Sequence, residues 1–237
     1  MTELPLNAAS PTPIAPQSTT ADAYAVQRQN MVDSQVRPSD ITDRRILRAM
    51  AAVPRENFLP DSLKAVAYMD NPIALDRTAR GRVMIEPRLF AKLVQLAEIP
   101  DGGRVLEIGS GTGYGVAVFG AMGFKAFGVE QDQTLSAIAA AADPKLAAQI
   151  SRGPLTLGLA AEGPYDAIIF AGSVADVPPA LFDQLKNGAR MVAVTGQPPA
   201  GKATVWLRTG VSHAARDAFD ASAPPLPGFA RAHSFSL

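Results

Sequence analysis

The stretch VLEIGSGTGYG, residues 105 to 115, decides the fold. An apolar run changes there into alternating glycines, Gly109, Gly111 and Gly113, and one carboxylate, Glu107, stands two residues before the first glycine. Glycine has no Cβ, so this loop can turn tightly and bring its backbone amides against a ligand. A strand, a glycine turn and a helix in this order are typical of a doubly wound sheet, which binds nucleotide-like ligands at the carboxyl ends of its strands.

After the loop, short apolar runs alternate with helical segments, which predicts a parallel sheet covered on both faces. The expected strands are 104–108, 125–130, 155–159, 167–171 and 190–195, followed by 203–208 and a closing strand near 230–235 as an antiparallel edge. The expected helices are 115–121, 134–142 and 179–185. The predicted fold class is α/β, a Rossmann-like, doubly wound, mostly parallel sheet with helices on both faces and an N-terminal helical extension.

The residues before the sheet supply that extension. Apolar residues at helical spacing predict one helix that ends near Pro38, a second at 44–53 and a third that opens at Glu86 and Pro87. Residues 55–82 are expected to form an irregular covering segment. We divide the chain into a flexible tail (1–20) rich in Pro, Ser, Thr and Ala, a helical cover segment (21–100) and a ligand-binding core (101–237), folded as one compact unit.

Composition excludes several classes of function. The chain has 22 basic and 22 acidic residues, so no net charge attracts nucleic acid or an anionic membrane. No apolar run approaches the roughly 20 residues of a membrane span, and the N-terminus has neither the basic nor the apolar region of a secretory signal. Cysteine is absent, which removes thiolate metal sites and is compatible with a reducing compartment. We predict a cytoplasmic protein with no metal, nucleic-acid or membrane partner.

The spacing of the glycines indicates the ligand. The dinucleotide pattern G-x-G-x-x-G fails because Tyr114 stands where its third glycine should be, and no Gly-Lys-Ser or Gly-Lys-Thr of a Walker loop exists. A carboxylate at Glu107 would repel a phosphate but suits a cationic ligand. Glu130 ends the next expected strand, 19 residues after Gly111, where an acid can accept both hydroxyls of a ribose.

The pattern E-x-G-x-G-x-G resembles motif I of the class I S-adenosylmethionine-dependent methyltransferases, whose cofactor carries an ammonium and a sulfonium in place of a pyrophosphate. The resemblance implies S-adenosylmethionine as the cofactor. The residues that it places on the cofactor are Glu107, Gly109, Ser110, Gly111, Thr112, Gly113, Tyr114, Glu130, Gln131 and Leu159.

Two further segments narrow the family. VPRENFLP at 53–60 and PPALFDQLKNGAR at 178–190 are the most specific parts of a resemblance, over about residues 30 to 195, to the protein-L-isoaspartate O-methyltransferases. This resemblance implies methylation of the α-carboxylate of isoaspartyl residues in damaged proteins, from which a succinimide forms and normal aspartate can be regained. A carboxylate is already ionised at neutral pH, so this reaction asks for a positioned acceptor and no general base.

The sequence departs from this family at two places. The family's T-I-S-x-P stretch, whose serine lies near substrate and cofactor, corresponds to residues 83–87, so that Ile85 replaces the serine. Met84, Ile85 and Glu86 are the candidates on the substrate side. Glu86 would repel a substrate carboxylate if it faced the pocket, and is otherwise a solvated residue at a helix start. The family's Gly-Asp after the third strand is also missing, so we expect adenine to be held by backbone and apolar contacts near Leu159.

Two alternatives keep the same fold. A small-molecule acceptor would use an apolar pocket made by Tyr68, Met84 and Ile85, and a non-catalytic protein would retain the fold and its cofactor. His213 and His233 lie outside any motif, and we expect them to be structural or surface residues. The sequence leaves the oligomeric state open.

Overall fold

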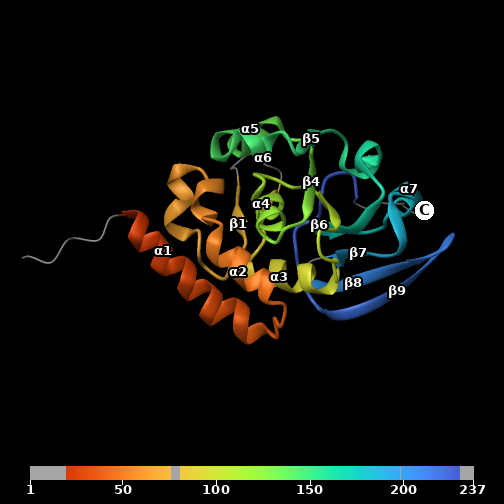
Figure 1. Cartoon of the computed structure of the whole chain (residues 1–237), viewed down its shortest axis with the longest axis horizontal. Coiled ribbons are helices and arrows are strands. Elements are labelled where there is room, and N and C mark those ends of the chain that lie inside the picture. The colour runs from red at the N-terminus through yellow and green to blue at the C-terminus, as the bar shows by residue number, and fades with distance from the viewer. Residues whose placement is uncertain (1–19, 76–80, 198, 230–237) are drawn as a thin grey trace, which may run out of the picture.

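The computed structural model describes residues 20–75, 81–197 and 199–229. Its centre is a seven-stranded sheet in the order β5-β4-β3-β6-β7-β8-β9, in which β3 to β7 pair in parallel and β8 and β9 are antiparallel (Figure 1). The strands are β3 (Arg104–Ile108), β4 (Lys125–Glu130), β5 (Ile150–Arg152), β6 (Tyr165–Val174), β7 (Leu185–Gln197), β8 (Ala200–Thr209) and β9 (Ser212–Asp220). The predicted α/β fold with a mostly parallel sheet is confirmed.

Both faces of the sheet are covered, as strand β6 illustrates. Ala167 and Ile169 join one buried apolar cluster, whereas Ile168 and Phe170 join the other. Successive side chains of a strand point to opposite faces, so a strand buried on both sides is apolar throughout. This explains why the sequence shows a continuous apolar run here and not an alternating one.

Helices supply the covering layers. The α-helices are α1 (Thr20–Met31), α2 (Arg44–Ala52), α3 (Pro87–Leu96), α4 (Tyr114–Ala121), α5 (Gln133–Ala142), α6 (Pro144–Ala147) and α7 (Pro179–Phe182). Buried residues of α2, α3 and α4 belong to the first cluster, and those of α7 belong to the second. The N-terminal helices lie at one end of the molecule and the β8–β9 hairpin at the other (Figure 1).

The cover segment is helical at its start and irregular later, as predicted. After α1 the chain continues through a π-helical turn, η1 (Val32–Val36), and a 3-10 turn, η2 (Arg37–Ser39), which contains Pro38. The 3-10 turns η3 (Arg55–Phe58) and η4 (Asp61–Val66) follow α2. A small antiparallel hairpin, β1 (Ile73–Ala74) with β2 (Val83–Met84), then leads into α3.

The predicted third strand at 155–159 is wrong. The strand at this place is β5, and residues 155–157 form a 3-10 turn, η5 (Leu155–Leu157), followed by a second turn, η6 (Ala160–Glu162). The side chain of Gln184 bonds the turn: its Nε2 donates to the Leu157 carbonyl at 2.8 Å and its Oε1 accepts from the Leu159 amide at 2.9 Å. The backbone groups that a strand would have bonded to a neighbouring strand are thus bonded by a side chain distant in the sequence.

The second half of the chain differs from expectation in other ways as well, since β6, β7 and β8 are longer than predicted. The predicted helix at 179–185 ends at Phe182, and Leu185 already begins β7. The antiparallel edge is completed by β9, which the sequence did not predict because its side chains are almost all exposed and lack an apolar alternation. The predicted closing strand near 230–235 and the predicted tail before Thr20 lie outside the described residues.

Neither a membrane span nor a metal site emerges from the described ranges. None of the helices described between residues 20 and 229 combines the length and apolar character that crossing a bilayer requires. Over the same ranges, no group of three or more His, Asp or Glu side chains is placed to hold a metal ion. His213 is exposed in β9 with its ring stacked on Phe182 at 3.8 Å, as expected of a surface residue, and His233 lies outside the described residues.

Candidate cofactor and acceptor site

The glycine loop joins β3 to α4 at the carboxyl ends of the parallel strands. Gly109, Gly111 and Gly113 have φ angles of 75°, 57° and 88°, in the left-handed region that other residues rarely adopt. The amides of Gly109 and Ser110 donate to the Val129 carbonyl at 3.0 and 3.2 Å, which fixes the loop to the end of β4. The glycines therefore have the conformational role that the sequence predicted.

Glu107 lies behind this loop, 3% exposed. Its carboxylate packs so closely on α4 that a Cβ at Gly115 would collide with it, and its Oε2 has no hydrogen-bond partner among the described residues. Burial raises the pKa of Glu107 to about 8; the Val116 amide opposes this shift, the charge of Glu130 adds to it and Arg82 opposes it. A buried acid without its own cation suits a ligand that brings one.

Glu130 ends β4 and is fully buried. Its Oε2 accepts from the Arg82 Nη2 and the Gly111 amide, both at 2.7 Å. Its Oε1 accepts from the Arg82 Nη1 at 2.9 Å, and from the amides of Gln131 and Asp132 at the same distance. Two carboxylate oxygens offer about four lone-pair sites, so these five donors leave no free acceptor. The acid expected to bind a ribose is saturated within the chain.

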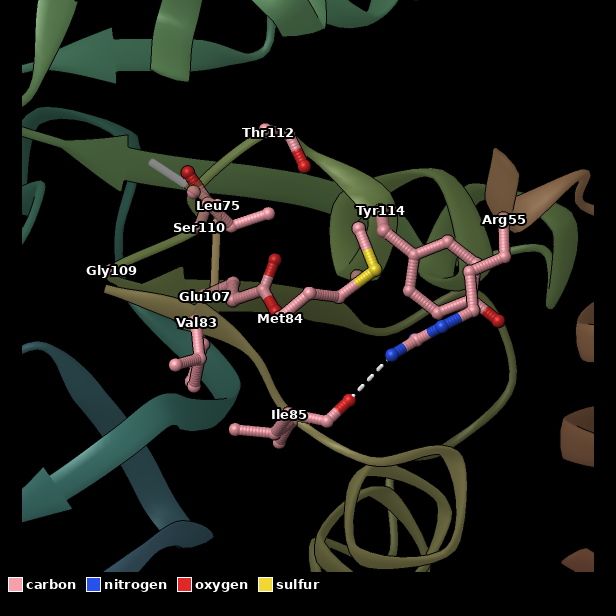
Figure 2. Close-up of a pocket in the computed structure, with 13 residues that line it drawn as sticks. Arg55, Leu75, Val83, Met84, Ile85, Glu107, Gly109, Ser110, Thr112 and Tyr114 are labelled. Atoms are coloured by element: carbon pink, nitrogen blue, oxygen red, sulfur yellow. Dashed lines mark hydrogen bonds between the residues drawn. The ribbon is translucent and has the colours of Figure 1, made fainter. Parts of the chain in front are cut away.

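A cavity lies between the glycine loop, the start of α4 and strand β2 (Figure 2). Its volume is about 30 Å³, which is room for about two water molecules. The predicted residues that line it are Met84, Ile85, Glu107, Gly109, Ser110, Gly111, Thr112 and Tyr114. The lining residues that sequence reasoning missed are Arg55, Leu75, Val83, Gly115 and Ala171. The predicted residues outside the lining are Glu86, Gly113, Glu130, Gln131 and Leu159.

Arg55 is the cation of this cavity and is fully buried. Its Nε donates to the Ala67 carbonyl at 2.9 Å and its Nη2 to the Ile85 carbonyl at 2.6 Å, while Nη1 has no hydrogen-bond partner among the described residues. Burial lowers the pKa of Arg55, yet a guanidinium starts so high that it stays charged. The sequence signal was its place in the VPRENFLP segment.

Polar atoms without partners gather around the same space. Besides the Arg55 Nη1 and the Glu107 Oε2, they include the Ser110 hydroxyl and the Tyr114 hydroxyl, whose ring packs 5.7 Å from that of Phe58. Buried polar groups are normally hydrogen-bonded, and each one left without a partner costs free energy. Such a concentration beside one cavity indicates a place for a polar ligand.

The Arg55 side chain holds the substrate-side stretch, residues 84–86, by a hydrogen bond to a backbone carbonyl. Ile85, in the place of the family serine, is buried and contributes its carbonyl to the Arg55 contact. Glu86 is half-buried at the N-cap of α3 and does not line the cavity, so the expected repulsion of a substrate carboxylate has no geometric basis in this conformation. Burial raises the pKa of Glu86, with a smaller contribution from Asp70.

Leu159 does not end a strand. Its amide bonds Gln184, and its carbonyl accepts from the Tyr165 hydroxyl at 2.6 Å. The segment that directly follows β5 is Gly153-Pro154, so proline stands there in place of the family's aspartate. The reasoning that selected Leu159 is therefore wrong about the strand, and its contact with adenine stays a prediction.

Comparison with known proteins identifies the family. The family model described as protein-L-isoaspartate(D-aspartate) O-methyltransferase matches residues 26–207. The chain belongs to this family. A protein-L-isoaspartate O-methyltransferase of Koribacter versatilis is 37% identical over 178 residues, which are 74% of this chain and 79% of the relative. Membership makes the chain an S-adenosylmethionine-dependent methyltransferase.

Solved structures agree with this assignment. A structure named protein-L-isoaspartate O-methyltransferase matches with a TM-score of 0.75 and 25% identity, covering 85% of this chain and 66% of the other. A structure from Plasmodium falciparum, in complex with S-adenosyl-L-homocysteine, matches with a TM-score of 0.69 over 84% of this chain and 97% of the other. At 18% identity this second likeness shows the fold alone.

The site fits the methionine end of the cofactor of this family. The Oε2 of the buried Glu107 and the Ser110 hydroxyl have no hydrogen-bond partner among the described residues. At the ribose end, Glu130 has the right chemistry, but its oxygens are occupied by Arg82 and backbone amides. The residues therefore suit S-adenosylmethionine, provided that Arg82 leaves Glu130.

Proposed function

We propose that this chain methylates the α-carboxylate of isoaspartyl residues in damaged proteins. The observation that supports this acceptor is the free Nη1 of the buried Arg55 in the cavity. A hydrogen bond from a guanidinium to a carboxylate is charge-assisted, and it is stronger in a low-dielectric interior than in water. A neutral, apolar acceptor would leave this donor without a partner.

The position of Arg55 also favours a carboxylate acceptor. Its Nη2 donates to the carbonyl of Ile85, the residue in the place of the serine that the family keeps near its substrate. Arg55 would hold one oxygen of the acceptor while the other attacks the methyl group. Because a carboxylic acid with a pKa near 4 is ionised at neutral pH, Arg55 has only to position it.

The cofactor, when bound, supplies an electrophilic methyl group on a sulfonium. Glu107 would accept hydrogen bonds from the ammonium group, and the loop of Gly109, Gly111 and Gly113, which lacks side chains at these positions, would let the ligand approach the backbone closely. Glu130 would accept from the ribose hydroxyls. The remaining predicted contacts are Ser110, Thr112, Tyr114, Gln131 and Leu159.

A small-molecule acceptor is less well supported. The apolar pocket expected for it included Tyr68, whose hydroxyl instead donates to Glu56 and accepts from Arg28. Met84 and Ile85 do line the cavity, but beside the charged Arg55. The cytoplasmic location also stays a prediction, based on the lack of cysteine.

The deciding experiment is transfer of labelled methyl from S-adenosylmethionine to an isoaspartyl peptide and to the same peptide with normal aspartate. Transfer to the isoaspartyl peptide alone is the expected result. Equal transfer to both peptides, or none to either, would contradict this acceptor and favour a small molecule or a non-catalytic protein.

Arg55→Gln tests the assigned role. We expect the KM for the isoaspartyl peptide to rise by about tenfold or more, since one charge-assisted hydrogen bond is lost. The matched control is Arg48→Gln, which changes an exposed arginine of α2. The thermal shift that S-adenosylhomocysteine causes should survive in both variants, and its loss in Arg55→Gln would assign Arg55 to the cofactor instead.

A further inference from the structure

Arg82 occupies the position that the cofactor needs. It is 4% exposed, precedes β2 directly, and pairs with Glu130 through both terminal nitrogens at 2.7 and 2.9 Å. The same Nη2 donates to the Gly109 carbonyl at 2.9 Å, so the guanidinium spans the acid and the glycine loop. A bidentate pair of this kind has fixed geometry and excludes other donors from the carboxylate.

The surrounding apolar contacts keep the same space filled. Leu75, at the other side of the β1–β2 hairpin, places its Cδ1 3.2 Å from where a Cβ of Gly111 would stand. The cavity that remains is about 30 Å³, far below the roughly 300 Å³ or more of a ligand pocket. Arg82 and Leu75 therefore occupy the space beside Glu130 and Gly111 where the cofactor would bind.

We propose that Arg82 is an internal competitor of the cofactor, which holds the ribose-binding acid Glu130 until the arginine is displaced and so sets the affinity of the chain for S-adenosylmethionine. This inference rests on the ribose-binding role proposed for Glu130. Displacement is structurally feasible because Gly81, exposed and with a φ of 86°, precedes Arg82 and gives the backbone freedom to rotate.

Glu130 does not depend on Arg82 alone. When the guanidinium leaves, the amides of Gly111, Gln131 and Asp132 still donate to its two oxygens. The two Arg82 nitrogens that withdraw can then be replaced by two ribose hydroxyls, so the carboxylate keeps the same number of donors. The exchange replaces one set of donors with another.

The size of the effect follows from the population of the paired state. If Arg82 holds Glu130 in about 90 to 99% of molecules, the apparent Kd of the cofactor is raised by about 10- to 100-fold. Arg82→Gln removes the charge and the bidentate pair. We therefore expect this variant to bind S-adenosylmethionine and S-adenosylhomocysteine at least about tenfold more tightly than the natural chain.

The test is calorimetric titration of the full chain with each of these two ligands, without a methyl acceptor. The control is Arg45→Gln, since Arg45 is also an ion-paired arginine, bound to Asp43 and Asp101, but lies in α2 and does not line the cavity. Unchanged or weaker binding in Arg82→Gln would overturn the inference, because a residue that merely supports the loop should weaken binding when it is removed. No binding by either protein would overturn it as well.

A second variant covers a failure of Arg82→Gln to fold, which its thermal unfolding would reveal. Arg82→Lys keeps the charge but cannot form the bidentate pair, so it should bind both ligands more tightly than the natural chain and less tightly than Arg82→Gln. Equal affinity of Arg82→Lys and the natural chain would contradict the inference. These titrations contain no methyl acceptor, so they test the role of Arg82 even if the chain does not methylate isoaspartyl peptides.

Discussion

At the scale of single residues, the site contains two charged groups with incomplete hydrogen bonding and one ion pair that is saturated. Glu107 and Arg55 are both buried and each has one polar atom without a hydrogen bond, whereas Glu130 and Arg82 satisfy each other. Leaving charges unpaired in a protein interior destabilises the fold. A ligand that bonds the unsatisfied atoms of Glu107 and Arg55 would recover this free energy.

Glu107→Gln should change how stability depends on pH. The folded pKa of about 8 lies above the ordinary value of 4.5, so the folded chain binds more protons than the unfolded chain between these values. Stability therefore falls as pH rises from 5 to 8, by on the order of 3 kcal/mol from this group. Glutamine cannot ionise, so the free energy of unfolding of the variant, measured with urea, should fall less between pH 5 and 8 than that of the natural chain. Parallel curves for both proteins would show that Glu107 does not titrate in this way.

The sequence predicted the loop residues of the site better than its long side chains. Only glycine adopts the backbone angles of Gly109, Gly111 and Gly113 without strain, so their spacing carries structural information. Arg82 and Arg55 reach their partners across 48 and 30 residues of sequence. Which carbonyl or carboxylate such a side chain meets depends on the assembled fold, and no local pattern encodes it.

At the scale of elements, helix α4 carries two glycines in different roles. Gly115 stands against the Glu107 carboxylate with no room for a Cβ, whereas Gly120 is exposed with nothing within 4 Å of that position. Gly115→Ala should therefore destabilise the chain by about 1–3 kcal/mol through overpacking. Gly120→Ala should stabilise it by about 0.5–1 kcal/mol, because alanine loses less backbone entropy in a helix. Thermal unfolding of both variants checks this, and a stable Gly115→Ala would contradict the close packing of Glu107.

Elements were predictable where one local pattern dominates. The bounds of β3 and β4 were correct because each is an apolar run between turn residues. Strand β5 was missed because it is short and only partly buried, while the leucines after Pro154 alternate as a strand would. Leu157 is nevertheless 63% exposed, so the alternation there does not report a buried face.

At the scale of the whole molecule, the C-terminal segment returns to the cofactor loop. The Leu226 amide donates to the Ser173 carbonyl at 2.8 Å, and the Ser173 amide donates to the Pro224 carbonyl at 2.9 Å. The Leu226 side chain fills the space left by the missing side chains of Gly109 and Gly172. The loop is thus packed both by Arg82 and by a residue more than one hundred positions later in the chain.

Leu226→Ala should therefore affect both stability and the loop. Leu226 is 3% exposed, and truncating a buried leucine costs about 2–5 kcal/mol, more when the cavity cannot collapse. The control is Leu157→Ala, where the side chain is 63% exposed and the change should stay within about 0.5 kcal/mol. Denaturant unfolding measures both, and hydrogen exchange of residues 109–113 should rise in Leu226→Ala alone, because the loop loses the packing of Leu226 against Gly109. Unchanged exchange in a destabilised variant would mean that the loop is held by β4 and Arg82 without the C-terminal segment.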